Sequence, residues 1–136
     1  MDAKKFAVGT IVGGIVIFAL GFVIFNVLLE SFYAANPGTA TGVQREAPLQ
    51  WSLAVGCLGY AALICYAMGA RAASGLGGGA KVGAIVGFLL WFTADFIIYA
   101  TSNTSTLTIT IVDPLVEIVH GGIGGAVIGL VVSKMK

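Results

Sequence analysis

Charged side chains are scarce in this chain of 136 residues, of which seven are basic and six are acidic. They make up 10% of the sequence, whereas a soluble domain averages about 25%. So few charges exclude an ordinary water-exposed surface, and a hydrophobic share of 58% excludes a disordered chain. A net charge of +1 without a large basic cluster excludes electrostatic binding of nucleic acid. The composition predicts one integral membrane domain over residues 1–136.

Chemically reactive residues are also few. His120 is the only histidine, and no serine–histidine or cysteine–histidine pair is evident. Cys57 and Cys65 are eight residues apart, which on a helix separates their Cα atoms by about 12 Å and excludes a disulfide bond. The glycine-rich segment 73–81 lacks the strand and spacing of a phosphate-binding loop, so we expect a flexible cytoplasmic linker there. These absences favour a protein that is not an enzyme, and the sequence identifies no cofactor.

Four long apolar stretches dominate what the sequence does contain. Each reaches the roughly 20 residues that a membrane-spanning helix needs. We therefore predict an all-α integral membrane four-helix bundle, with helices at about 6–30, 49–70, 81–101 and 105–133.

The basic residues orient this bundle. Six of the seven fall on one side of the predicted membrane: Lys4, Lys5, Arg71, Lys81, Lys134 and Lys136. Only Arg45 falls on the other side. Because positive charge is enriched in cytoplasmic loops, both termini are expected in the cytoplasm. The localisation that we expect is a bacterial inner (cytoplasmic) membrane.

Glycine is abundant, with 20 residues, many of them inside the predicted helices. Small residues let membrane helices approach closely, and a four-residue spacing places them on one face. That spacing relates Gly83 to Gly87 and recurs in Gly121, Gly125 and Gly129. We expect these faces to pack helices of one chain against each other, with a homo-oligomer as the alternative.

A stripe of polar residues runs along the last predicted helix, and its members share one helical face. They are Thr106, Thr110, Asp113, Glu117, His120 and Gly124, at spacings of four, three, four, three and four. Pro114 falls within this stripe. Either the helix continues through a kink at Pro114, or Asp113 caps a helix that begins at Pro114.

Other predicted helices supply partners for this stripe. Asp95 lies in the outer half of the third helix, and Asn26 and Glu30 lie at the outer end of the first. Polar residues at membrane depth usually face the bundle interior or a water-filled cavity. We expect Asp95, Asp113, Glu117 and His120 to line an outward-facing acidic cavity, with Asn26 and Glu30 as further candidate residues. The alternative for Glu30 is an exposed position at the end of the first helix. Such acids must be protonated, share protons, bind a cation or be solvated.

Two ligand hypotheses centre on His120. The Glu-x-x-His spacing of Glu117 and His120 resembles half of a di-iron carboxylate motif, so these residues are candidate metal ligands. His120 is also a candidate axial ligand of a pigment or haem, with Gly121 and Gly122 leaving room beside it.

Three short segments resemble a family of small four-span membrane proteins of bacteria and fungi. They are residues 21–26, residues 83–88, and Glu117 to His120 followed by the glycines up to Gly129. The resemblance covers nearly the whole chain. It implies the four-helix architecture and no particular activity.

Two functions are consistent with these features. The first is a membrane protein whose polar cavity binds or translocates a proton, a cation or a small molecule. The alternative is a structural or accessory subunit of a larger membrane complex. A variant of this alternative binds a pigment or haem through His120. The expected partners are the lipid bilayer and either a second copy of the chain or a larger membrane complex.

Overall fold

The computed structural model describes all residues from Met1 to Lys136, and 79% of them are helical with no strand. The elements in chain order are α1 (Ala3–Val23), a single π-helical turn η1 (Ile24–Leu28), α2 (Glu30–Ala35), α3 (Gln50–Ala70), α4 (Gly75–Thr101) and α5 (Leu107–Lys134). Local sequence explains two of the helix starts. Asp2 accepts a hydrogen bond from the Lys5 amide before α1, and Thr106 accepts one from the Ile109 amide before α5.

Four helical segments are long and apolar enough to cross a membrane: Ala3–Leu28, Gln50–Ala70, Gly75–Thr101 and Leu107–Lys134. Only 26 of the 136 residues are buried, and large apolar side chains cover the outside. Ile15 and Val55, for example, are more than half exposed. An exterior of this kind indicates a membrane protein, because lipid is the solvent that tolerates it.

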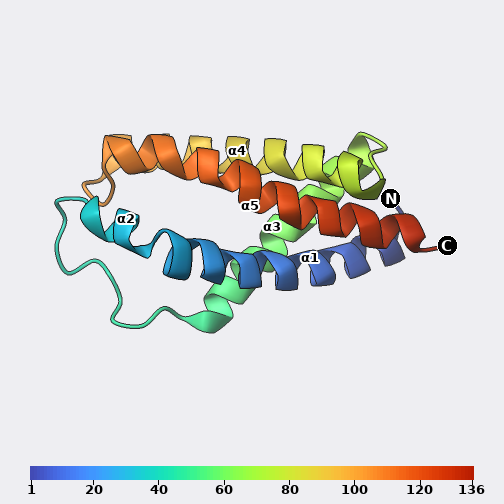
Figure 1. The fold of residues 1–136 in the computed structure, drawn as a ribbon, viewed down its shortest axis with the longest axis horizontal. Coiled ribbons are helices and arrows are strands. Elements are labelled where there is room, and N and C mark those ends of the chain that lie inside the picture. Colours follow the sequence, from blue (N-terminus) through green and yellow to red (C-terminus); the bar gives the residue numbers. More distant parts are fainter.

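The helices form one bundle in which α4 and α5 lie side by side along their lengths (Figure 1). In the same view α1 runs below this pair, and α3 crosses behind at an angle. Both termini and the short 71–74 connection lie at one end, which we call the terminal end (Figure 1). The long 36–49 loop and the 102–106 turn lie at the other, which we call the loop end.

Two predicted boundaries are wrong. The segment 75–81, expected as part of a flexible linker, forms roughly the first two turns of α4. The reason is tertiary, because Gly79 lies against the backbone of Gly125 and Gly129 on α5. The first helix, expected to continue to residue 30, instead changes to a π-helical turn at Ile24 and is interrupted at Leu29.

The last helix settles the choice left open at Pro114. α5 runs without interruption from Leu107 to Lys134 with Pro114 inside it, so Asp113 is not a helix cap. The Thr-rich start is helical because the Thr110 amide and hydroxyl both donate to the Thr106 carbonyl, at 3.0 and 2.9 Å. Pro114 has no N–H group to donate to the Thr110 carbonyl, so one hydrogen bond of the helical ladder is missing there.

Glycines bring the backbones of α4 and α5 into direct contact. A Cβ atom placed on Gly83 would lie 2.9 Å from both the Gly121 carbonyl carbon and the Gly125 Cα. A Cβ on Gly79 would meet Gly125 and Gly129, and one on Gly87 would lie 2.5 Å from the Glu117 carbonyl oxygen. The two helices are therefore antiparallel, and the numbers of two residues that face each other add up to about 204–208, as for Gly83 with Gly121 and Gly125. The same register, continued toward the loop end, brings Asp95 opposite Asp113.

The half of the bundle near the terminal end is apolar. Its buried core joins α1, α3, α4 and α5 through nine residues: Ile17, Tyr60, Ala61, Ile64, Cys65, Met68, Val82, Ile128 and Val132. Tyr60 is the only member with a hydroxyl group, and it lies where this core meets the polar stripe. Cys57 and Cys65 are free thiols, as their spacing requires.

Candidate functional site: a buried acid–histidine cluster

Four ionisable side chains are buried together in the half of the bundle nearer the loop end. Asp95 comes from α4, and Asp113, Glu117 and His120 come from α5. Their exposed fractions are 7%, 8%, 1% and 5% in the same order. Neither lysine nor arginine forms an ion pair with any of them. Buried charges without a cation are expensive, so the proton content of this cluster decides its stability.

Glu117 and His120 form a pair whose geometry determines how many protons it holds. Nδ1 of His120 lies 3.1 Å from each Glu117 carboxylate oxygen, and Nε2 lies 2.9 Å from the Ile17 carbonyl oxygen. A carbonyl only accepts, so Nε2 carries a hydrogen. Nδ1 therefore either donates a second hydrogen to an ionised Glu117 or accepts one from a protonated Glu117. Both arrangements share one proton between the two side chains and leave the pair without net charge.

α3 and α1 complete the surroundings of this pair. The Tyr60 hydroxyl donates to Oε2 of Glu117 at 3.2 Å. The rings of Tyr60 and Phe25 stand edge-to-face to the imidazole, with centroids 6.0 and 5.9 Å away. Gly21 lies beside the imidazole, and a Cβ there would be in ordinary van der Waals contact with Cε1 of His120, at 3.6 Å. Aromatic walls hold the ring in one orientation and shield its proton from water.

Asp95 is the member of the cluster whose hydrogen-bonding groups do not all have a partner. Its Oδ2 atom is buried and has no hydrogen-bond partner. The carboxyl faces Asp113 across the α4–α5 contact, with Glu117 as the next acid along α5. Trp91, one turn earlier on α4, also buries an Nε1–H group without a partner. A buried carboxylate oxygen left unpaired beside a second carboxylate is unfavourable unless a proton lies between them.

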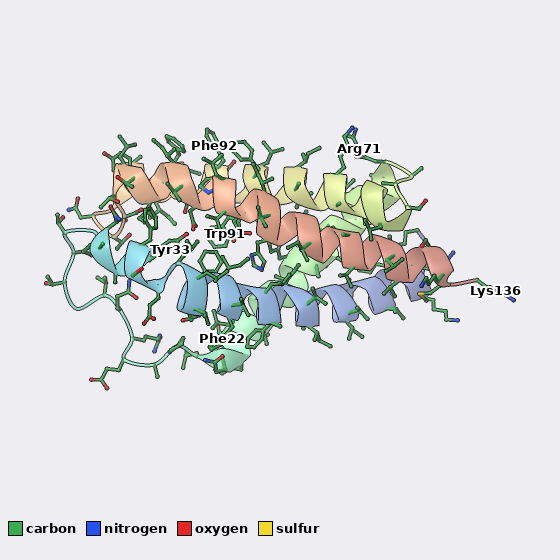
Figure 2. All side chains as sticks on the ribbon, viewed as in Figure 1. Phe22, Tyr33, Arg71, Trp91, Phe92 and Lys136 are labelled. Carbon is green, nitrogen blue, oxygen red and sulfur yellow. The ribbon has the colours of Figure 1, made fainter.

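Tyr33 of α2 contacts the cluster from the loop end. Its hydroxyl donates to Oδ1 of Asp113. Burial, together with the Asp113 carboxylate, raises the pKa of Tyr33 far above its usual value, so the hydroxyl keeps its proton and remains a donor. The chain reaches Asp113 because the helix is interrupted at Leu29, whose φ and ψ of −114° and 6° are not helical. Figure 2 shows Tyr33 and Trp91 between the α1–α2 segment and the α4–α5 pair, with Phe22 on the outer side of α1.

Asn26 and Glu30, two candidates from the sequence, lie outside this cluster. Both side chains are exposed. On α1 and η1 the buried residues include Ile17 and Ile24, and Asn26 lies two residues after Ile24. Two residues rotate a helix by about 200°, which places Asn26 on the opposite face. Glu30 follows the interruption at Leu29 and begins α2 at the loop end.

A cavity of about 520 Å³ lies at the loop end, beside the cluster but not within it. Its walls come from α2, the loop after it, the 102–106 turn and the start of α5. Polar groups on these walls belong to Tyr33, Asn36, Gln44, Thr104 and Ser105. None of the four buried ionisable residues lines this cavity. Tyr33 lines the cavity and also contacts the cluster, through its hydrogen bond to Asp113.

The metal and haem hypotheses gain no support from this geometry. No group of three or more histidine, cysteine, aspartate and glutamate side chains is arranged to hold a metal ion. Both ring nitrogens of His120 already have protein partners, in Glu117 and in the Ile17 carbonyl. An axial bond from His120 would require one of these hydrogen bonds to break.

The chain matches no family model, no curated protein and no solved structure. Two residues that hydrogen-bond to members of the cluster, Tyr33 and Tyr60, were not among the candidates from the sequence. The signal for Tyr60 was a hydroxyl group near the middle of the apolar run 49–70, which also holds Ser52 and Tyr66. Tyr33 gave no comparable signal, since its contact depends on the interruption at Leu29.

Proposed function

We propose that this chain is a small integral membrane protein that binds a proton in the cluster of Asp95, Asp113, Glu117 and His120. The proton is taken up from and returned to the side of the loop end. The observation that carries the proposal is the unpartnered Oδ2 atom of Asp95, buried beside Asp113. A proton shared between these two carboxyls removes one charge and supplies the missing hydrogen bond.

The remainder of the cluster supports proton binding over cation binding. The Glu117–His120 pair is neutral with one shared proton, so it attracts no second positive charge. Tyr33 and Tyr60 present O–H donors toward Asp113 and Glu117, and hydroxyl hydrogens aimed at carboxylates are suited to proton sharing. A metal ion would require lone pairs to converge on one point.

Uptake from the loop end follows from what lies on either side of the cluster. On the terminal side, α5 has no ionisable or hydroxyl residue between Gly121 and Val132. The buried core there is apolar, with Ile64, Met68 and Ile128 fully buried. On the loop side, the polar-walled cavity reaches Tyr33. In this conformation the cluster is a site of proton binding and not a continuous path across the bundle.

The sidedness of the bundle is part of the same proposal. Lys4, Lys5, Lys134 and Lys136 lie beside the two termini, and Arg71 lies in the connection at the same end (Figures 1 and 2). We place the terminal end in the cytoplasm because positive charge is retained there during insertion. The cluster then exchanges its proton with the outside. A bacterial inner membrane is the location that we propose.

A role as an accessory subunit is the second candidate, and α3 is the observation that favours it. Nothing lies within 4 Å of the position that a Cβ would take at Gly56 or Gly59. With Ser52, these residues form an exposed small-residue face on the helix that crosses the bundle. Such faces allow close approach of another membrane helix. Purification under mild detergent would test this candidate, which predicts a fixed partner or a dimer that Gly56→Leu abolishes.

Infrared spectroscopy of Asp95→Asn tests the proton site directly. Wild-type protein at neutral pH should show the C=O stretch of a protonated carboxylic acid. Asp95→Asn should remove one component of that band while keeping the fold, because the amide replaces the acid O–H as a donor to Asp113. Glu30→Gln is the matched control, since Glu30 is exposed and should not contribute. No carboxylic acid band in the wild type, or an unchanged band in Asp95→Asn, would refute the proposal.

The pH dependence of stability provides a second measurement. Carboxyl groups of an unfolded chain release their protons at about pH 4. If the folded chain keeps such a proton at higher pH, the stability of the fold decreases as pH rises, until the folded chain releases the proton as well. The wild type should therefore lose thermal stability toward alkaline pH. Asp95→Asn should lose less, because one of the two adjacent carboxyls no longer ionises.

A further inference from the structure

We propose that the Tyr33 side chain is a gate between the loop-end cavity and the buried cluster, closed by its hydrogen bond to Asp113. This inference rests on the proposed proton site, because it concerns how the proton reaches that site. Tyr33 controls how fast the bound proton exchanges with water, whereas the cluster determines how many protons are bound.

The position of Tyr33 between two environments is the first argument. One side of the residue lines the cavity of about 520 Å³, together with neutral polar residues such as Asn36 and Thr104. A cavity of this volume has room for several water molecules, each of which occupies roughly 30 Å³. The hydroxyl on the other side donates to Asp113, which is 8% exposed. Tyr33 therefore connects the wall of the cavity to the nearest acid, Asp113.

The aromatic neighbours of Tyr33 define its closed position. Its ring stands edge-to-face to Phe25 and to Phe32, with both centroid distances at 5.6 Å. Phe25 in turn contacts the His120 ring. The closed gate is thus an apolar barrier of rings with one polar contact, the hydroxyl on Asp113. Because the Tyr33 hydroxyl hydrogen is already directed at Asp113, exchange between Asp113 and water in the cavity requires the Tyr33 side chain to rotate.

The backbone around Tyr33 limits the motion to its side chain. On one side the chain is attached to the bundle through η1. On the other, the Ala40 amide donates to the Asn103 carbonyl at 3.0 Å, and Gly38 packs against the backbone of Thr104. A Cβ at Gly38 would overlap that backbone, so the loop is seated closely on the turn. With both flanks held, rotation of the Tyr33 side chain is the smallest motion that connects the cavity to Asp113.

Hydrogen–deuterium exchange of the carboxylic acid band tests the gate. Protein in lipid is transferred into D₂O buffer, and the rate at which the band shifts is recorded. Tyr33→Phe keeps the ring and removes the closing hydrogen bond, so exchange should be about ten- to hundredfold faster, as expected for loss of a hydrogen bond to a charged group. Tyr33→Ala removes the ring as well and should exchange faster still. Tyr66→Phe is the matched control, because Tyr66 is 70% exposed and lies on α3 without a hydrogen bond to the cluster.

The outcomes separate the gate from the proton site. A band with equal exchange rates in the wild type, Tyr33→Phe and Tyr33→Ala would overturn the gate and leave the proton site intact. Absence of the band in the wild type would refute the site itself. Protection of the buried Cys65 thiol against a thiol reagent reports whether each variant is folded. If Tyr33→Ala does not fold, the ratio of the exchange rate of Tyr33→Phe to that of the wild type decides by itself whether Tyr33 is a gate.

Discussion

Replacing Gly83 by alanine tests the contact that sets the register of α4 against α5. The new Cβ would lie 2.9 Å from the Gly121 carbonyl carbon and from the Gly125 Cα. Real Cβ atoms do not approach that closely, and backbone atoms of a packed helix cannot rotate away. The two helices must therefore separate along their shared length, and the displacement reaches Asp95 and Asp113 at the loop end.

The magnitude follows from comparison with Gly56→Ala on α3. Both changes replace a mid-helix glycine, so both gain the same helix propensity of about 1 kcal/mol, which cancels in the comparison. Nothing lies within 4 Å of a Cβ at Gly56, so that variant has no steric cost. Overpacking costs about 1–3 kcal/mol, and we expect the upper end because the opposing atoms are backbone. The variants should differ by about 3 kcal/mol, or roughly 10 °C in melting temperature.

Thermal unfolding monitored by a thiol-reactive dye measures this difference, because Cys65 is fully buried until the bundle opens. The midpoint of Gly56→Ala should equal or exceed that of the wild type, and the midpoint of Gly83→Ala should be clearly lower. Equal midpoints for the two variants would show that α4 and α5 do not touch at Gly83. The register that places Asp95 opposite Asp113 would then be wrong as well.

Two further predictions concern the topology and Tyr60. Ser74→Cys and Thr39→Cys are introduced separately into a chain whose native cysteines are replaced. The two new cysteines should be labelled from opposite sides of the membrane, with Ser74→Cys reactive only from the cytoplasm. Labelling of Thr39→Cys from the cytoplasm would contradict the orientation. Tyr60→Phe removes the donor to Glu117 and should lower the free energy of unfolding by about 1 kcal/mol, whereas Tyr66→Phe on the exposed face of the same helix should leave it unchanged.

The local sequence pattern was sufficient to predict the spanning helices and the residues that one helix contributes to the site. Runs of about 20 apolar residues with few charges predict spanning helices wherever they occur, because lipid requires each backbone group to bond within its own helix. The 3.6-residue period then places Asp113, Glu117 and His120 on one face of α5, and the three-residue spacing brings Glu117 against His120. These relations lie within one helix, so no knowledge of its neighbours was required.

Relations between helices depend on backbone contacts that no periodicity encodes. Glycine spacing indicated close faces on α4 and α5, but the offset at which they meet, and hence the pairing of Asp95 with Asp113, came from the contact of Gly83 with Gly121. The contact of Gly79 with Gly125 and Gly129 lies within residues 75–81, which are helical although their glycine content favours a linker. The sequence shows which residues share one face of a helix. How far that helix is shifted and rotated relative to its neighbour is set only by the contact of the two backbones.

The position of Tyr33 shows the same limit most clearly. Its hydroxyl reaches Asp113, 80 residues away in the chain, because the helix stops at Leu29 and restarts in α2. A continuous first helix through residue 30, as the pattern predicts, has no such interruption. Apolar periodicity specifies that a segment is helical but is insensitive to a single interrupted turn, whose stability comes from the rings and the carboxyl that it meets. The sequence by itself thus determined four long apolar helices, one of them with an acidic face, and the tertiary structure decided which acids face one another and that Tyr33 contacts them from the loop end.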